Sequence, residues 1–339
     1  MVAISFVSGK GGTGKTTVAL NLGAAMASMG RRVMLVDADM LTHSLSILCH
    51  LEEEKGLTDL FTNSDLPIKN TVFDVLGVPN LQVIPSSISF GLLARMSRLL
   101  NGKKSFVARR MSEISRSAEY VLIDAPAGVS REVFFAASMG DRYCLVAEAG
   151  PADLEGALVF NVFARRIGLD SIGIIFNRAR TAPPESLKTL CKDIFGQVVG
   201  TIPFDIRFVE AFEERSIFYQ RYPEAPASRS IEQIARALER LGRYDEALPS
   251  LDRTIELKPD NANAWNNKGV TLERLGRYNE ALLCFDRTIE LKPDNANAWN
   301  NKGVTLTRLN MVKEAESCFA KANEINPKRA HDSETALVL

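Results

Sequence analysis

Residues 2–17 of the chain are VAISFVSGKGGTGKTT, an apolar run followed directly by a glycine-rich segment. The run Val2–Ser8 has the length and composition of a buried β-strand, and a helical pattern begins at Thr16. Between them, Gly9–Thr16 fits G-x-x-x-x-G-K-[ST]. In that pattern the glycines let backbone N–H groups close around phosphate oxygens, and the next helix directs its N-terminus at the anion. The sequence therefore predicts a phosphate-binding loop between a strand and a helix.

Two residues of this loop carry the expected phosphate and metal chemistry. Lys15 would reach the β- and γ-phosphates of a nucleotide, and the hydroxyl of Thr16 would ligate Mg²⁺ directly. The apolar strand Tyr120–Asp124 ends in an acid, which suits a magnesium role. We therefore expect ATP or ADP with Mg²⁺ as the ligand. The residues expected to contact it here are Gly9, Lys10, Gly11, Gly12, Thr13, Gly14, Lys15, Thr16 and Thr17.

The same glycines also fit a dinucleotide-binding pattern. Gly9, Gly11 and Gly14 match G-x-G-x-x-G, and Asp37 ends the next predicted strand. This alternative, a dinucleotide-dependent oxidoreductase, explains neither the lysine nor the threonine that close the segment. The phosphate-binding loop of an ATP-binding protein is the better interpretation.

Short apolar runs alternate with amphipathic stretches through the first two thirds of the chain. The runs have strand length and are rich in Val, Ile and Leu, as parallel strands buried on both faces are. They are Val2–Ser8, Arg32–Asp37, Tyr120–Asp124, Tyr143–Ala147, Ser171–Asn177 and Val198–Ile202. Stretches between them, such as Thr16–Met29 and Leu154–Ile167, have helical patterns. This alternation predicts an α/β fold with a doubly wound, mainly parallel sheet over residues 1–227.

Charge and cysteine content narrow the class of protein. The 339 residues include 41 Lys plus Arg and 41 Asp plus Glu, so the formal net charge is zero. The net charge therefore gives no support for binding to nucleic acid or to an anionic membrane. No specific nucleic-acid binding is expected. Five scattered cysteines without a C-x-x-C pair indicate reduced thiols of a cytoplasmic protein. No apolar run approaches the ~20 residues that span a bilayer.

The last third of the chain repeats itself. Asp252–Leu272 recurs unchanged as Asp286–Leu306, and Glu239–Tyr244 recurs as Glu273–Tyr278. Self-similarity at this period marks helix–turn–helix repeats. The segment resembles the tetratricopeptide (TPR) family through residues at its signature positions. These are Trp265, Gly269, Ala281, Phe285 and Pro293 in one copy, and Trp299, Gly303, Ala315, Phe319 and Pro327 in the next.

A more degenerate copy precedes these two, with Ile231 in place of the Trp and Ala235 in place of the Gly. We therefore expect an all-α TPR helical-hairpin solenoid that shares the helix beginning near Ser228 with the α/β domain. The three predicted repeats cover residues 228–261, 262–295 and 296–329. A tail of residues 330–339 follows them.

The first helices of TPR repeats line a groove that commonly receives a peptide. Asn and Arg side chains there would hydrogen-bond an extended peptide backbone or a carboxylate. The alternative is a solvated polar face on a spacer or dimerisation element. The residues expected in the groove are Asn263, Asn266, Arg274, Asn297, Asn300 and Arg308.

Three separated motifs resemble the MinD/ParA family, and MinD more closely than ParA. Residues 10–17, KGGTGKTT, are similar to its deviant Walker A sequence, which has a lysine inside the loop. Val36–Asp39 is similar to its switch I, and Leu122–Gly128 to its Walker B and switch II. The resemblance covers about residues 1–240.

The resemblance implies a dimer that encloses nucleotide, with Lys10 of each copy reaching phosphates bound by the other. Lys10, Lys15 and Asp39 would be catalytic, and Asp39 would orient the attacking water. Asp37 and Asp124 would hold Mg²⁺ through its water shell. From the residues alone, Asp37 also fits a strand end or helix cap, and Asp39 a loop acid.

The resemblance also implies contacts to the adenine base. Asn177, which is followed by Arg178, matches the family's adenine-contacting Asn, and Pro203 lies where a base-packing loop is expected. From the residues alone, the Asn-Arg pair also fits an ordinary turn.

The chain departs from the MinD pattern in two places. Near Ser44 and His50, MinD-like proteins usually have an Asn and a Gly. TPR repeats also occupy the end where MinD proteins carry a short amphipathic membrane-targeting helix. Direct membrane binding is therefore not expected, and recruitment to a membrane or cell pole would require a partner.

Together these features predict a magnesium-dependent ATPase, slow unless stimulated, that acts as a switch. ATP would drive homodimerisation, and the TPR arm would recruit a protein or peptide partner, in spatial positioning such as division-site or organelle placement. The alternative is a nucleotide-stabilised TPR scaffold with little or no ATP turnover.

Overall fold

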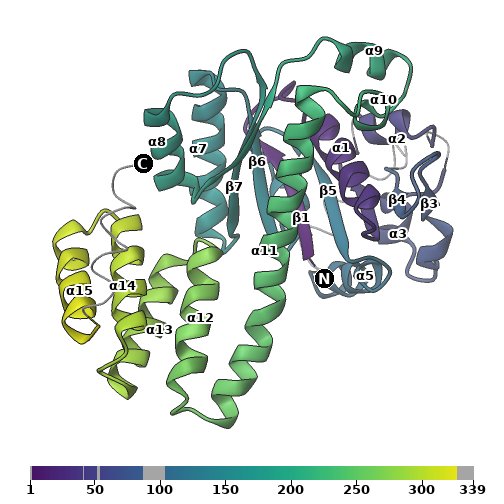
Figure 1. Cartoon of the computed structure of the whole chain (residues 1–339). Helices are drawn as coiled ribbons and strands as arrows, with labels where there is room; N and C mark the ends of the chain where they lie inside the picture. The colour runs from purple at the N-terminus through teal and green to yellow at the C-terminus, as the bar shows by residue number, and fades with distance from the viewer. Residues whose placement is uncertain (1, 41, 52–53, 87–103, 327–339) are drawn as a thin grey trace. The chain divides into compact units, whose positions relative to one another are not determined.

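The computed structural model describes residues 2–40, 42–51, 54–86 and 104–326 (Figure 1). The chain divides into two compact units, Met1–Glu239 and Arg240–Leu339. Among the described residues, every helix is too short or too polar to cross a bilayer. The predicted tail and the end of the third predicted repeat lie outside the described residues.

An eight-stranded sheet forms the centre of the first unit, with strand order β3-β4-β2-β5-β1-β6-β7-β8. All neighbouring strands are parallel except β3 and β4. The strands are β1 (Val2–Ser8), β2 (Val33–Asp37), β3 (Phe73–Asp74), β4 (Leu81–Ile84), β5 (Tyr120–Ala127), β6 (Arg142–Ala147), β7 (Ser171–Ala179) and β8 (Val198–Pro203). The predicted doubly wound, mainly parallel sheet is confirmed.

The first unit also contains helices, several of which cover the two faces of the sheet (Figure 1). They are α1 (Lys15–Ser28), α2 (Ser44–Leu48), α3 (Leu57–Thr62), the 3₁₀ turn η1 (Ile68–Asn70), α5 (Lys104–Ser115), α6 (Arg131–Ala137), α7 (Pro151–Arg166), α8 (Glu185–Phe195), α9 (Arg207–Glu213) and α10 (Phe218–Arg221). Helix α11 (Pro226–Leu257) begins in this unit and continues past its end at Glu239. Apolar residues of α3, α5, α6, α7 and α8 share one core with Met34 and Val36 of β2. Leu35 alternates with these two and contacts α1 on the other face.

The strands β1, β2 and β5 are buried almost throughout, which explains their continuous apolar sequences. Each of the six predicted strands is present, within three residues of its expected ends. Two further strands were not predicted: β3 has two residues and β4 has four. Runs this short carry too little alternation to be distinguished from loop sequence.

The second unit contains two similar helical hairpins, α12 (Ala262–Arg274) with α13 (Tyr278–Leu291) and α14 (Ala296–Arg308) with α15 (Val312–Ile325). A Cβ atom on Gly269 would lie 2.5 Å from the ring of Phe285, and one on Gly303 would lie 2.7 Å from that of Phe319. The glycines therefore allow the two helices of each hairpin to approach closely.

Each hairpin is also fixed by the same polar contacts at its start. The Asn261 and Asn295 side chains cap α12 and α14 by accepting hydrogen bonds from backbone N–H groups. Trp265 Nε1 donates to the Pro259 carbonyl, and Trp299 Nε1 to that of Pro293, both at 3.0 Å. The half-buried tryptophans therefore join each hairpin to the turn before it.

The first predicted repeat differs from this arrangement. Its expected turn, at Leu241–Tyr244, lies inside the continuous helix α11, so the hairpin at 228–261 is not formed. The boundary between the two units follows Glu239 and lies inside α11, whereas the sequence predicted a boundary after residue 227. Two substitutions give a physical reason, since Ala235 replaces the close-packing glycine and Leu251 the phenylalanine that meets it.

Gly242 and Gly276 provide a matched test of this difference, because identical residues surround them. Gly276 lies in a turn at φ +75° with no atom near its missing Cβ, whereas Gly242 lies within α11. Gly276→Ala should destabilise the second unit by about 1 kcal/mol, because an L-residue is strained at positive φ. Gly242→Ala should not destabilise it, because alanine favours a helix.

Urea unfolding followed by tryptophan fluorescence measures these effects, since both tryptophans of the chain, Trp265 and Trp299, lie in this unit. Equal destabilisation by the two substitutions would contradict the continuous helix.

Candidate nucleotide-binding site

The predicted phosphate loop connects β1 to α1 at the carboxyl edge of the sheet. Gly12 and Gly14 adopt φ values of +83° and +82°, the left-handed conformation that favours glycine. Ser8 Oγ donates to the Lys10 carbonyl at 2.7 Å, and α1 begins at Lys15. The loop therefore delivers the N-terminus of a long helix to one point, as anion binding requires.

Two residues at the end of β7 hold this loop from one side. Asn177 Nδ2 donates to the Thr13 carbonyl at 2.8 Å, and Arg178 Nη1 donates to the Gly12 carbonyl at 2.7 Å. A Cβ atom on Gly14 would lie 2.4 Å from Asn177 Nδ2. The structure thus gives the predicted adenine-binding pair a second role in shaping the loop, and their contact with a base stays a prediction.

Helix α7 holds the loop from the other side. A Cβ atom on Gly9 would lie 1.9 Å from the carbonyl carbon of Gly156, so the two backbones touch. Lys10 Nζ lies 3.6 Å from a carboxylate oxygen of Asp153, near the start of the same helix, and the Lys10 side chain is 56% exposed. Lys10 therefore reaches toward the start of α7 with more than half of its side chain exposed.

The strongest electrostatic feature of the site is a pair of buried acids beside a buried lysine. Asp37 and Asp124 are direct neighbours across β2 and β5. Burial raises the pKa of Asp124 to about 7, the charge of Asp37 adds to this, and the charge of Lys15 opposes it. Burial also lowers the pKa of Lys15, although the charges of Asp124 and Asp39 act in the opposite direction. The described residues thus place the ammonium group of Lys15 close to the carboxylates of Asp124 and Asp39.

The two acids differ in how their oxygens are satisfied. Both oxygens of Asp124 are buried and, among the described residues, neither has a hydrogen-bond partner at good geometry, although the Thr16 side chain is near enough to help lower the Asp124 pKa. A buried carboxylate with so few partners fits a position beside a cation, so the donor set at this point suits Mg²⁺. Asp37, by contrast, accepts hydrogen bonds from Ser46, Ser86 and the backbone of Asp39. Asp124 is therefore the better-placed of the two for a metal.

The remaining predicted residues lie along the same edge. Asp39 is two residues beyond the end of β2, and its side chain accepts a hydrogen bond from the Thr42 backbone at 3.2 Å. Thr16 and Thr17 lie in the first turn of α1, and Pro203 ends β8, paired with Ala179 of β7. The parallel sheet therefore brings segments far apart in the chain to the predicted site.

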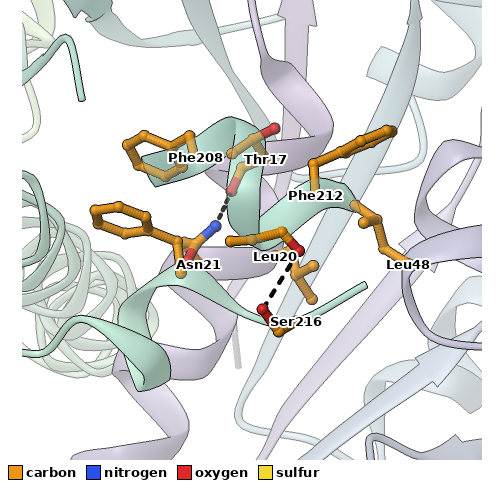
Figure 2. A pocket seen from close by; sticks show the side chains of 9 residues that line it. Thr17, Leu20, Asn21, Leu48, Phe208, Phe212 and Ser216 are labelled. Atoms are coloured by element: carbon orange, nitrogen blue, oxygen red, sulfur yellow. Dashed lines mark hydrogen bonds between the residues drawn. The ribbon is translucent and has the colours of Figure 1, made fainter. Parts of the chain in front are cut away.

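A small pocket lies beside α1, starting from its first turn (Figure 2). Its walls come from α1, α2, α9 and α10 and are mostly apolar. They consist of Thr17, Leu20, Asn21, Leu48, Phe208, Ala211, Phe212, Ser216 and Phe218. Asn21 Nδ2 donates to the Thr17 carbonyl, and Asn21 Oδ1 accepts from the Tyr219 backbone at 2.7 Å. Helix α2, which follows the loop carrying Asp39, thus packs beside α1 and α9.

In the second unit, contacts between α12 and α14 involve several of the predicted groove residues. Asn301 Nδ2 donates to Asn266 Oδ1 at 3.2 Å, and Glu273 lies 3.9 Å from Arg308 and 3.7 Å from Arg274. Both arginine side chains remain more than a third exposed. Peptide binding by this set, including Asn263, Asn297 and Asn300, stays a prediction.

Sequence reasoning did not identify several residues that shape the site. Ser46 and Ser86 bind Asp37, and Asp153 and Gly156 contact the phosphate loop. A glycine inside a helical pattern, as at Gly156, is a sequence signal of close backbone approach. The two serines and Asp153 carried no comparable signal.

Known protein families match both the N-terminal and the C-terminal part of the chain. Residues 1–167 match a family model described as an AAA domain, and residues 233–296 and 284–317 match tetratricopeptide repeat models. The second unit thus contains TPR repeats, as predicted.

Individual relatives are similar to this chain over about 70% of its length. An uncharacterized ATP-binding protein of Methanocaldococcus jannaschii is 30% identical over 240 residues, 70% of this chain and 87% of the relative. The antiactivator FleN of Pseudomonas aeruginosa is 25% identical over 246 residues, 70% of this chain and 85% of that protein. The structure of the septum site-determining protein MinD of Pyrococcus horikoshii, complexed with Mg-ADP, superposes with a TM-score of 0.62 and 26% identity, covering 71% of this chain and 96% of that one.

Asp124→Asn tests the buried charge directly. In nucleotide-free protein with EDTA, the Asp124 pKa is 3.8 in the unfolded chain and about 7 when folded. The folded state therefore holds this proton more tightly. The contribution of Asp124 to the free energy of unfolding is largest below pH 3.8 and falls, by at most ~4 kcal/mol, as the pH rises to about 7. Asn avoids this loss, so the variant should melt above wild type at pH 8, by a margin that shrinks toward pH 5.

Asp205→Asn is the control, because a hydrogen bond from Arg207 lowers the pKa of Asp205. That variant should gain no stability at pH 8. Equal melting temperatures for wild type and Asp124→Asn at pH 8 would contradict the raised pKa of this buried carboxylate.

Proposed function

Because the chain belongs to the MinD/ParA family of P-loop proteins and carries TPR repeats, we propose that it is an ATP-driven switch. It binds ATP with Mg²⁺, forms a homodimer around the nucleotide and hydrolyses it slowly. Its TPR arm recruits a partner protein. The proposed setting is the cytoplasm, where such a switch acts in spatial positioning.

One observation carries the nucleotide and metal part of this proposal. The two oxygens of Asp124 are buried with no hydrogen bond at good geometry, close to the Thr16 side chain and to a lysine that is 7% exposed, at the end of a phosphate loop. Leaving a carboxylate in this state is costly, and a cation brought with a phosphate offsets the cost. A simple glycine-rich turn would need neither the acid nor the lysine.

The roles of the residues follow from their positions. Lys15, at the first position of α1, would neutralise phosphate charge, and Thr16 and Asp124 would hold Mg²⁺. Bound Mg²⁺ supplies positive charge to the phosphate oxygens. Asp39 lies on the loop after β2, where it would orient a water for attack on the terminal phosphate. Lys15 and Asp39 are the residues we assign to catalysis within one copy of the chain.

Lys10 motivates the dimer. Its side chain is 56% exposed, and its ammonium group lies 3.6 Å from a carboxylate oxygen of Asp153, which is itself 11% exposed. Exchange of this ion pair for phosphates bound by a second copy would place Lys10 across the dimer.

The TPR repeats motivate partner recruitment. The exposed arginines at 274 and 308 flank Glu273, and amide side chains lie beside them. Such a surface suits an extended peptide with carboxylate groups. The named relatives act in septum-site determination and as an antiactivator, so positioning at a division site or organelle is the proposed role. Direct membrane binding and specific nucleic-acid binding are not part of it.

A scaffold with little or no turnover is the second candidate. The departures at Ser44 and His50 favour it, because they fall in the segment that follows Asp39. In that case nucleotide would stabilise the fold, and the TPR surface would be the functional site. Turnover clearly above that of Lys15→Ala would exclude this candidate.

Size-exclusion chromatography with light scattering tests the switch. Wild type should be monomeric without nucleotide and with ADP–Mg²⁺, and dimeric with ATP–Mg²⁺. Asp39→Ala should remain dimeric longer, because hydrolysis is slowed, by about tenfold or more if it positions the water. Lys10→Ala should bind ATP without forming the dimer.

Arg32→Ala, a surface change away from the loop, serves as the control for oligomeric state. A mass that does not change with nucleotide in any of these proteins would contradict the switch and favour the scaffold.

A further inference from the structure

A buried hydrogen-bond cluster ties the end of β2 to two other segments. Asp37 Oδ2 accepts hydrogen bonds from the Ser46 backbone at 3.1 Å, from Ser46 Oγ at 2.7 Å and from Ser86 Oγ at 2.9 Å. Ser46 Oγ also accepts from the Ser86 backbone at 3.0 Å. All three side chains are fully buried. The cluster therefore joins the end of β2, the first turn of α2 and the residue that follows Pro85.

His43 joins this cluster from the loop. Its Nδ1 atom lies 2.6 Å from Ser86 Oγ. Ser86 has one hydroxyl hydrogen, and its acceptors are Asp37 and Ser46 Oγ, so that hydrogen is already used. With Asp37 ionised and the Ser86 hydroxyl donating to it, the tautomer that satisfies the cluster has a hydrogen on His43 Nδ1, which donates to Ser86 Oγ.

The backbone of His43 supports a dedicated role for this contact. Its φ of +49° is left-handed, which costs an L-residue roughly 1 kcal/mol or more. His50 has a similar φ of +58°, but its side chain is exposed. The hydrogen bond to Ser86 is what distinguishes His43 and offsets its backbone strain.

The loop between these anchors carries Asp39. The Asp39 backbone donates to Asp37 Oδ1 at 3.1 Å, and the His43 backbone donates to the Asp39 carbonyl at 3.2 Å. Asp39 is thus bounded on one side by Asp37 and on the other by His43. Fixing these two residues restricts the backbone that carries the Asp39 carboxylate.

We propose that His43 is a positioning residue, which clamps the loop onto Ser86 and Asp37 and thereby sets the place of Asp39. This inference rests on the proposed ATPase function for its catalytic consequence, but the clamp itself does not. None of the three sequence motifs includes His43 or Ser86, and the contact between them is formed by residues 43 apart in the chain.

Three variants separate the contact from its surroundings. His43→Ala removes the donor, and His43→Asn keeps an N–H close to the Nδ1 position in a residue that tolerates positive φ. His50→Ala is the matched control, a histidine at a similar φ without the clamp. The full chain is used throughout.

Hydrogen exchange of peptides covering residues 42–51 in nucleotide-free protein measures the clamp. His43→Ala should exchange the Ser46 amide about tenfold faster, as expected for loss of one buried hydrogen bond, whereas His43→Asn and His50→Ala should match wild type. Unchanged exchange in His43→Ala would overturn the clamp.

ATP turnover and ATP affinity, measured with Mg²⁺, then test the effect on Asp39. His43→Ala should lower kcat about tenfold with less than a threefold change in affinity, and His43→Asn should restore most of the rate. Faster exchange with wild-type kcat would overturn the positioning role. If wild type itself shows no turnover, the proposed ATPase function fails, and the exchange result alone decides the clamp.

Discussion

Two buried carboxylates lie side by side at the carboxyl edge of the sheet, and the rest of the site is arranged around them. Asp37 and Asp124 are direct neighbours in adjacent strands, with Lys15 as the buried cation near them. Three donor groups of Ser46 and Ser86 satisfy Asp37, whereas among the described residues Asp124 accepts no hydrogen bond at good geometry and has only the Thr16 side chain close by. This imbalance makes the folded protein receptive to a cation, and a phosphate-bound Mg²⁺ meets that requirement.

The phosphate loop next to these acids is shaped before any ligand arrives. Asn177 and Arg178 hold its carbonyls from the end of β7, and Gly156 of α7 meets Gly9 backbone to backbone. Residues held in this way lose little freedom when they bind, so binding energy is not spent on ordering them. Lys10 differs from them, because more than half of its side chain is exposed and it forms an ion pair with Asp153 at 3.6 Å. The site thus combines a fixed phosphate cradle with one lysine side chain that is partly exposed.

Local and continuous features could be predicted from the sequence. The strands β1, β2 and β5 have unbroken apolar sequences, and the loop is one contiguous motif. Contacts between distant segments could not, and the bond between His43 and Ser86 is an example. The residues Glu239–Tyr244 show the same limit, since the identical residues 273–278 include a turn while the first copy is helical. Packing partners decide between the two outcomes, because the local sequence is the same.

The central claim is that this loop and its acids bind ATP with Mg²⁺. Isothermal titration of the full chain with ATP, with and without EDTA, tests it most directly, with Lys15→Ala and NAD as comparisons. The account predicts ATP binding that weakens when Mg²⁺ is chelated, is lost in Lys15→Ala, and has no counterpart with NAD. Binding of NAD, or ATP binding that Lys15→Ala and EDTA leave unchanged, would contradict it.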